Sequence, residues 1–152
     1  MIQFNKSVLF VLLAAALMII APSSPRVSFA AEEKSGGDTE LAKQMEQIQD
    51  NLKKLRKTVK DSAANKDSLE TLSKLQALTV SSKALVPAKA AARPEAERVK
   101  FVAGYRKDMA ALLEHFCKIE TAVLDNDNAK ADELFKQIKK LEDAGHEKYS
   151  DQ

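Results

Sequence analysis

Two side chains far apart in this sequence carry groups that bind transition metals. His146 lies near the end of the last predicted helix and is one of two histidines in the chain, and Met45 lies near the start of the first. Each also has an ordinary structural interpretation, because methionine fills gaps in cores and a histidine near a helix C-terminus interacts favourably with the helix dipole. Their meaning therefore depends on whether the fold brings these two helix ends together.

Amphipathic stretches predict the first two of the helices that would position these residues. Asp38 or Thr39 can cap the first helix. Its apolar residues recur at alternating intervals of four and three, as in a helix buried along one side: Leu41, Met45, Ile48, Leu52, Leu55 and Val59. After a short connection at 62–66, the sequence 67–70 reads as a capping box that opens the second helix, which should stop before Pro87. Its apolar side holds Leu69, Leu72, Leu75 and Leu78.

Two further helices are predicted beyond an alanine- and lysine-rich loop at 88–93. Pro94 suits the first position of the third helix, whose apolar residues are Phe101, Tyr105, Leu112, Phe116, Ile119 and Val123. The polar cluster 125–128 should end that helix and cap the fourth, roughly 129–149, which is expected to bury Ala131, Leu134, Ile138 and Leu141. No stretch has the alternation of a strand. The fold class predicted is all-α, an up-down-up-down antiparallel four-helix bundle.

The first 30 residues are predicted to be a secretory signal peptide. Lys6 precedes an apolar run of 14 residues at 8–21, which is short for a membrane span. Small residues at Ser28 and Ala30 favour cleavage after Ala30. The mature chain would then begin with a flexible leader at 31–38, which contains Gly36 and Gly37, followed by a four-helix domain at 39–152.

The charge of the mature chain argues against several kinds of partner. Lys6 and Arg26 fall in the signal peptide, which leaves 22 of the 24 basic residues against all 22 acidic residues. A neutral surface of mixed sign does not favour nucleic acid or an anionic membrane, which need a basic stripe. The single cysteine, Cys117, excludes an internal disulfide and is expected to be a small buried hydrophobe.

The predicted topology places the start of helix one and the end of helix four at the same pole of the bundle. Met45 and His146 would therefore approach each other there, and Phe101 and Tyr105, in the first third of helix three, would add an aromatic wall. A thioether, an imidazole and an apolar lining are what a b-type haem requires.

The same residues resemble the soluble cytochrome b562 family. The resemblance is carried, in order, by Met45-Glu46, by the sequence 51–53 (Asn-Leu-Lys), by 101–105 (Phe-Val-Ala-Gly-Tyr) and by 146–149 (His-Glu-Lys-Tyr). It covers essentially the whole mature chain, and the signal peptide agrees with the family's periplasmic location. Cytochrome b562 is itself an example of the up-down-up-down bundle, so the resemblance and the fold prediction are not independent.

By this resemblance, Met45 and His146 would be the axial iron ligands of one non-covalent haem b per chain, with Phe101 and Tyr105 packed against the porphyrin. Two features depart from the family pattern. Gly145 stands where a bulkier residue is expected, and glycine lowers helix propensity by about 1 kcal/mol relative to alanine. The third helix is also about one turn longer than the family norm.

Other metal sites have weaker support in the sequence. His115 lies about 21 Å along helix three from Phe101 at ~1.5 Å per residue, so it is interpreted as a polar-face residue rather than a partner of His146. Met109 could replace Met45 only if the helices were in a different register. A di-iron site needs Glu-x-x-His motifs on two helices, whereas the nearest match here is a single Asp143-x-x-His146.

The expected function is therefore a periplasmic, monomeric one-electron carrier that is not an enzyme, with an unidentified periplasmic redox partner and no membrane association in its mature form. The sequence lacks the features that would indicate hydrolytic chemistry: it has no Gly-x-Ser-x-Gly motif, and no second histidine is placed near His146. The alternative is a haem-free helical bundle that binds periplasmic proteins as a scaffold or chaperone. It would present an exposed apolar groove and would be colourless.

Overall fold

The computed structural model describes residues 39–150, and the predicted signal peptide and leader lie outside these residues. Four helices make up most of the described chain: α1 (Glu40–Thr58), α2 (Asn65–Ala84), α3 (Glu95–Leu124) and α4 (Asn128–Tyr149). Two short 3₁₀ helices, η1 (Ser62–Ala64) and η2 (Ala88–Ala90), lie in the connections between α1 and α2 and between α2 and α3. No strand occurs in residues 39–150, and none of their helices is long and apolar enough to cross a membrane. The all-α prediction is confirmed.

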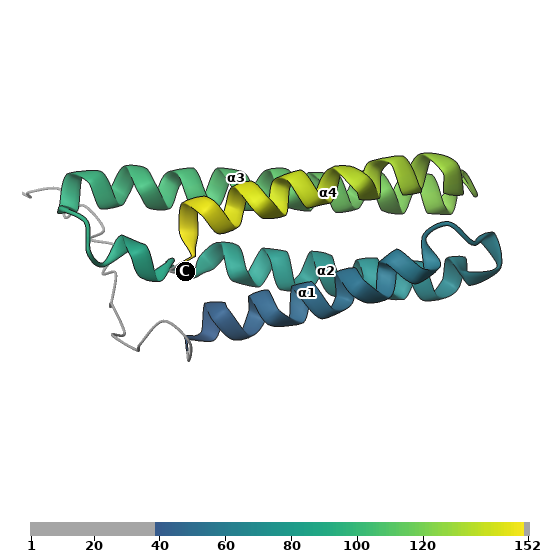
Figure 1. Cartoon of the computed structure of the whole chain (residues 1–152), viewed down its shortest axis with the longest axis horizontal. Helices are drawn as coiled ribbons and strands as arrows, with labels where there is room; N and C mark the ends of the chain where they lie inside the picture. The colour runs from purple at the N-terminus through teal and green to yellow at the C-terminus, as the bar shows by residue number, and fades with distance from the viewer. Residues whose placement is uncertain (1–38, 151–152) are drawn as a thin grey trace, which may run out of the picture. The chain divides into compact units, whose positions relative to one another are not determined.

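The helices form an antiparallel bundle in which each pairs with its sequence neighbour (Figure 1). Hydrogen bonds from α2 fix its direction: Ser68, near its start, reaches Thr58 at the end of α1, and Ser82, near its end, reaches Gln44 at the start of α1. The three sequential helix pairs are closely packed, whereas the closing pair, α1 and α4, approaches less closely. The least tightly closed seam of the bundle therefore lies between the helices that carry Met45 and His146.

The start of α2 differs from its prediction. The Asp67–Glu70 capping box is wrong, because α2 begins earlier, at Asn65, and its N-cap is Ala64 without a side-chain hydrogen bond. Asp61 instead caps the 3₁₀ turn η1 by accepting from the backbone N–H of Ala63, and that turn runs directly into α2. Ser68 is consequently a buried residue inside the helix.

The remaining helix ends lie close to their predicted positions. Thr39 caps α1 by accepting from the N–H of Ala42 at 3.1 Å, and Asp127 caps α4 by accepting from the N–H of Lys130 at 2.9 Å. Pro94 is the N-cap of α3 rather than its first helical residue. The α3–α4 turn uses Asn126 in the left-handed region, at φ 57°, which asparagine tolerates better than most residues.

Large apolar side chains from all four helices form the core, including Leu55, Leu72, Phe116 and Ile138. Two expectations about α3 and α4 are wrong: Leu141 is 38 % exposed, and Cys117 is exposed. The buried stripe of α4 runs instead through Ala131, Phe135 and Ile138. Cys117 lies one residue, about 100° of helical rotation, from the buried Phe116, and Leu141 lies three residues beyond the buried Ile138.

Candidate functional site

One pole of the bundle holds the start of α1, the end of α2, the start of α3 and the end of α4, as predicted. Polar contacts tie three of these ends together. The side-chain oxygen of Gln44 accepts hydrogen bonds from the hydroxyls of Ser81 and Ser82, at 2.9 and 2.8 Å. The buried hydroxyl of Tyr105 donates to the backbone carbonyl of Ser82 at 2.9 Å. These bonds fix α1, α2 and α3 relative to one another near the residues of interest.

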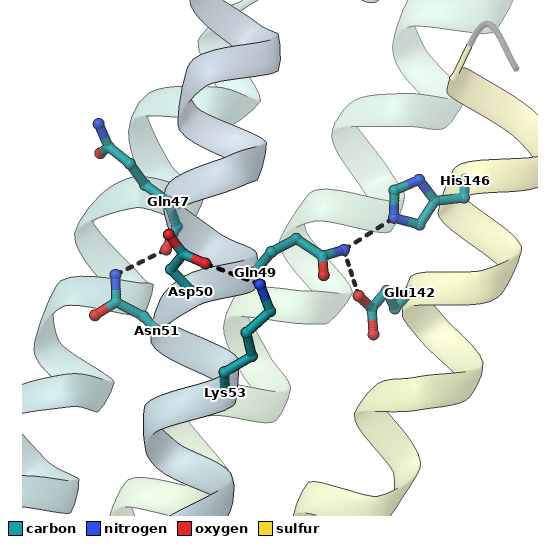
Figure 2. A network of polar contacts seen from close by, with 7 residues as sticks. All are labelled: Gln47, Gln49, Asp50, Asn51, Lys53, Glu142 and His146. Atoms are coloured by element: carbon teal, nitrogen blue, oxygen red, sulfur yellow. Dashed lines mark hydrogen bonds and ion pairs between the residues drawn. The ribbon is translucent and has the colours of Figure 1, made fainter.

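His146 contacts α1 through one ring nitrogen and its own helix end through the other (Figure 2). Its Nε2 lies 3.0 Å from Nε2 of Gln49, and its Nδ1 lies 3.1 Å from Oγ of Ser150. The same Gln49 nitrogen donates to a carboxylate oxygen of Glu142, one turn before His146 on α4. The imidazole is exposed, but it bridges towards α1 rather than extending into solvent.

The hydrogen-bond partners of this ring assign its proton to one nitrogen. The Gln49 amide must turn its NH₂ group towards Glu142, because its carbonyl oxygen there would face another acceptor. The same NH₂ group meets Nε2 of His146, so Nε2 must accept. The ring proton is then on Nδ1, where it can be donated to Ser150. In this tautomer the lone pair of Nε2 is directed towards Gln49 on α1.

Met45 lies on the face of α1 that carries Gln49, whose side chain contacts this imidazole. It precedes Gln49 by four residues, so the two side chains share one helix face, one turn apart. Met45 is partly buried and packs against the core. The structure therefore brings the elements that carry Met45 and His146 together at one pole, and iron ligation by these two residues stays a prediction.

The two predicted aromatic residues contact a third aromatic residue, Tyr149, from the end of α4. The Tyr149 ring lies edge-on to Phe101 and to Tyr105, with centroid distances of 5.2 and 5.3 Å. The guanidinium of Arg93 lies 4.1 Å from the centroid of Phe101. Phe101 is partly buried and Tyr105 is 3 % exposed. The aromatic wall therefore exists at the expected pole, and its contact with a porphyrin is untested.

Tyr149 is also held by a polar contact with α3. Its hydroxyl donates to Asp108 at 2.7 Å, and Lys148 forms an ion pair with the same carboxylate oxygen at 3.1 Å. Burial alone would raise the pKa of Asp108, but the hydrogen bonds from Tyr149 and Lys148 lower it overall. Burial and the bond to Asp108 raise the pKa of Tyr149 to about 12, and burial also raises the pKa of Tyr105. Both tyrosines are therefore neutral hydrogen-bond donors at physiological pH.

The other candidate ligands lie elsewhere. Met109 is buried in α3. His115 was expected on the polar face of its helix, but it is only partly exposed. Its Nε2 lies 2.7 Å from the backbone carbonyl of Leu134, so it joins α3 to α4. Within residues 39–150 no three or more His, Cys, Asp or Glu side chains are grouped so that they could hold a metal ion, as a di-iron site would need.

A groove with a volume of about 280 Å³ follows the seam between α1 and α4. Its apolar lining consists of Leu52, Phe135 and Ile138, and charged side chains surround it: Arg56, Lys60, Asp132, Lys136, Lys139 and Glu142. Glu142 belongs both to this groove and to the contact with His146. The seam is thus open to the surface from the site towards the opposite pole.

The comparison with known families identifies the family of this chain. The family model for cytochrome b562 matches residues 40–150, which includes all four helices. The chain belongs to the cytochrome b562 family. Among curated proteins, no relative matches it. Membership of the cytochrome b562 family places the chain among helical bundles that bind b-type haem and act as electron carriers.

The donor groups at this pole fit such a haem. An imidazole whose Nε2 is directed towards the neighbouring helix, and a thioether on that helix, are the two donor types that a b-type haem iron accepts. Nδ1 of His146 is bonded to Ser150, and a second hydrogen bond of this kind normally orients a metal-bound histidine. A Cβ placed on Gly145 would meet no atom of the described chain within 4 Å, so the glycine leaves open space beside the histidine.

Three residues of this site were not singled out from the sequence: Gln49, Glu142 and the ring of Tyr149. Helical spacing could have indicated the first two, because Gln49 follows Met45 by four residues and Glu142 precedes His146 by four. Tyr149 stands in the motif that carried the resemblance, but its contacts with α3 depend on the packing of α4, which no local pattern encodes.

Proposed function

We propose that this chain is a periplasmic electron carrier whose single, non-covalent haem b is held by Met45 and His146, and that it is not an enzyme. The observation that best supports this proposal is the contact between Nε2 of His146 and Gln49, which follows Met45 by one helical turn on α1. Family membership supplies the haem class. The predicted signal peptide supplies the periplasmic location.

The residues at the pole would each contribute to this role. When bound, haem supplies an iron that exchanges one electron between its ferric and ferrous states. His146 would present Nε2 while Ser150 holds its ring orientation. The soft thioether of Met45 would favour ferrous iron and would raise the reduction potential. Phe101 and Tyr105 would exclude water on the α3 side. Because Met45 and His146 would both hold the iron, the group would suit electron transfer rather than catalysis.

The first test is the absorption spectrum of the protein purified from periplasm with haem supplied, before and after reduction with dithionite. We expect a Soret band and sharp α and β bands in the reduced form, and an N-terminus at Ala31. Met45→Ala should shift the reduced spectrum and lower the potential. His146→Ala should weaken haem binding by roughly tenfold or more, since even residues that support a metal ligand contribute tenfold to a hundredfold.

Met109→Leu and His115→Gln are the matched controls, because they change the same residue types elsewhere in the bundle. Both should keep the wild-type spectrum. An unchanged reduced spectrum and potential in Met45→Ala would refute the ligand assignment. A protein that stays colourless with added haem would refute the electron-carrier proposal and favour the protein-binding scaffold.

A further inference from the structure

We infer that Gln49 competes with the haem iron for His146 and so limits how tightly and how fast this chain takes up haem. The inference rests on the proposed function, because it concerns the same histidine. It starts from the contact between Nε2 of Gln49 and Nε2 of His146, 3.0 Å apart (Figure 2). Nε2 of the neutral imidazole has one lone pair. That lone pair can accept a hydrogen bond from Gln49 or bind iron, but it cannot do both.

The Gln49 amide is held in place from two sides. Its NH₂ group has two N–H donors, and its two acceptors, Glu142 and His146, lie one helical turn apart on α4. We call these three residues the Gln49 clasp. Because Glu142 anchors the amide, the second N–H remains directed at the histidine. Figure 2 shows the Gln49 side chain extending from α1 to α4 to make both contacts.

The clasp spans the least tightly packed seam of the bundle. α1 and α4 approach less closely than the three sequential helix pairs, so a side chain that bonds both helices contributes to holding them together there. A porphyrin between Met45 and His146 would have to displace the Gln49 amide from the histidine. The clasp therefore opposes haem binding twice, by using the ligand lone pair and by joining the two helices.

The clasp also keeps His146 in the tautomer that iron requires. With Nε2 accepting from Gln49, the ring proton lies on Nδ1, next to Ser150. Iron binding at Nε2 requires the same proton position. Displacing Gln49 thus costs its hydrogen bond to His146 without a tautomer change. One such bond corresponds to roughly a twofold to tenfold change in an equilibrium constant.

The test compares haem binding by wild type, Gln49→Leu, Gln49→Ala and the control Gln47→Leu. Gln47 is exposed on α1, two residues away, and its side chain is directed away from α4 in Figure 2. Haem affinity is measured by titration and the association rate by stopped flow. We expect both Gln49 variants to bind haem roughly twofold to tenfold more tightly and to associate faster. Gln47→Leu should match the wild type.

A second measurement detects the hydrogen bond between Gln49 and His146 in the haem-free protein, through the tautomer of the histidine. Long-range proton–nitrogen NMR spectra report which nitrogen of His146 carries the proton. Wild type should show the Nδ1–H form, and both Gln49 variants should show more of the Nε2–H form. If the tautomer shifts but haem affinity and rate do not change, the inference is wrong while the proposed function stands.

Two further outcomes are decisive. Tighter binding in Gln49→Leu but not in Gln49→Ala would show that an added apolar contact, not the loss of competition, raises the affinity, and this would overturn the inference. Failure of the wild type and of all three variants to bind haem would overturn the proposed function itself. The two failures are therefore distinguishable.

Discussion

At the residue scale, the hydroxyl and the ring of Tyr149 both join the end of α4 to α3. The hydroxyl of Tyr149 bonds to Asp108, and its ring lies edge-on to Phe101 and Tyr105. Edge-to-face pairs of this kind each add about 0.5–1.5 kcal/mol beyond the area they bury. Because Tyr149 follows His146 by three residues, these contacts hold the turn of α4 that carries the proposed iron ligand.

The Tyr149 contact predicts an unusual alkaline titration. Its pKa in the folded protein is about 12, against an ordinary value of 10.0. A tyrosine with a raised folded pKa favours the fold while it is protonated. Its stabilisation is therefore complete below pH about 10 and is lost as the pH rises towards 12. In native buffer, tyrosinate absorbance should stay low through pH 10 and rise near pH 12. In denaturant, both tyrosines should titrate near pH 10.

Tyr149→Phe is the control for this titration, since it keeps the ring and removes the hydroxyl. Tyr105 is then the one tyrosine left in the chain, and burial raises its pKa too. The step near pH 12 should disappear from the variant. A native midpoint near pH 10 in the wild type would instead mean that the Tyr149 hydroxyl faces solvent and does not bond Asp108.

At the scale of the element, α4 continues through Gly145 without a break and ends at Tyr149. Glycine inside a helix costs roughly 0.5–1 kcal/mol relative to alanine, because it loses more backbone freedom on folding. A Cβ at this position would meet no atom of the described chain within 4 Å. Gly145→Ala should therefore raise the free energy of unfolding by about 0.4–1 kcal/mol, as measured by urea denaturation.

The neighbouring position gives the matched control for this change. Ala144 is exposed on the same helix, so Ala144→Gly should lower stability by a similar amount. If Gly145→Ala were destabilising, α4 would have to bend or open at Gly145 in solution. In that case His146 would not be held as part of a continuous helix.

The sequence was sufficient to predict the helices because their apolar spacing and end signals agreed with one another. Thr39, Asp127 and the polar turn at 125–128 determined boundaries correctly. The start of α2 could not be read in this way. Two candidate caps lie close together there, and the 3₁₀ turn capped by Asp61 leads into α2 at Asn65, upstream of the candidate box at Asp67. A local capping motif does not show which of two nearby caps is used when each could accept from free backbone N–H groups.

The candidate site was predictable only as far as topology extends. The order of the helices was enough to place Met45, Phe101, Tyr105 and His146 at one pole. The rotation of each helix about its axis was not, which is why Leu141 was expected in the core and is partly exposed. Contacts such as that of Gln49 with Glu142 and His146 depend on this rotation. Such contacts can therefore be identified only from the three-dimensional structure.

At the scale of the whole molecule, the two poles of the bundle are held together differently. Opposite the proposed haem site, asparagines join both interhelical connections. Asn128 donates to the backbone carbonyl of Val59 and to the side chain of Asn65, at 2.9 and 2.8 Å. Asn65 donates in turn to the carbonyl of Val123 and to Asn126. This asparagine network fixes the ends of all four helices at one pole, and the Gln49 clasp joins α1 and α4 near the other.

This division predicts that stability and haem binding can be changed separately. Asn128→Ala removes both of its donated bonds and leaves the carbonyl of the buried Val59 without this partner, so it should lower the free energy of unfolding by roughly 1–3 kcal/mol. Asn128 lies about 27 Å along α4 from His146, at ~1.5 Å per residue, so haem affinity should change less than about twofold. Urea denaturation and haem titration measure the two quantities, and Gln137→Ala, exposed on α4, should change neither. A marked loss of haem affinity in Asn128→Ala would show instead that the asparagine network controls the spacing of α1 and α4 along their whole length, so that the two poles act as one unit.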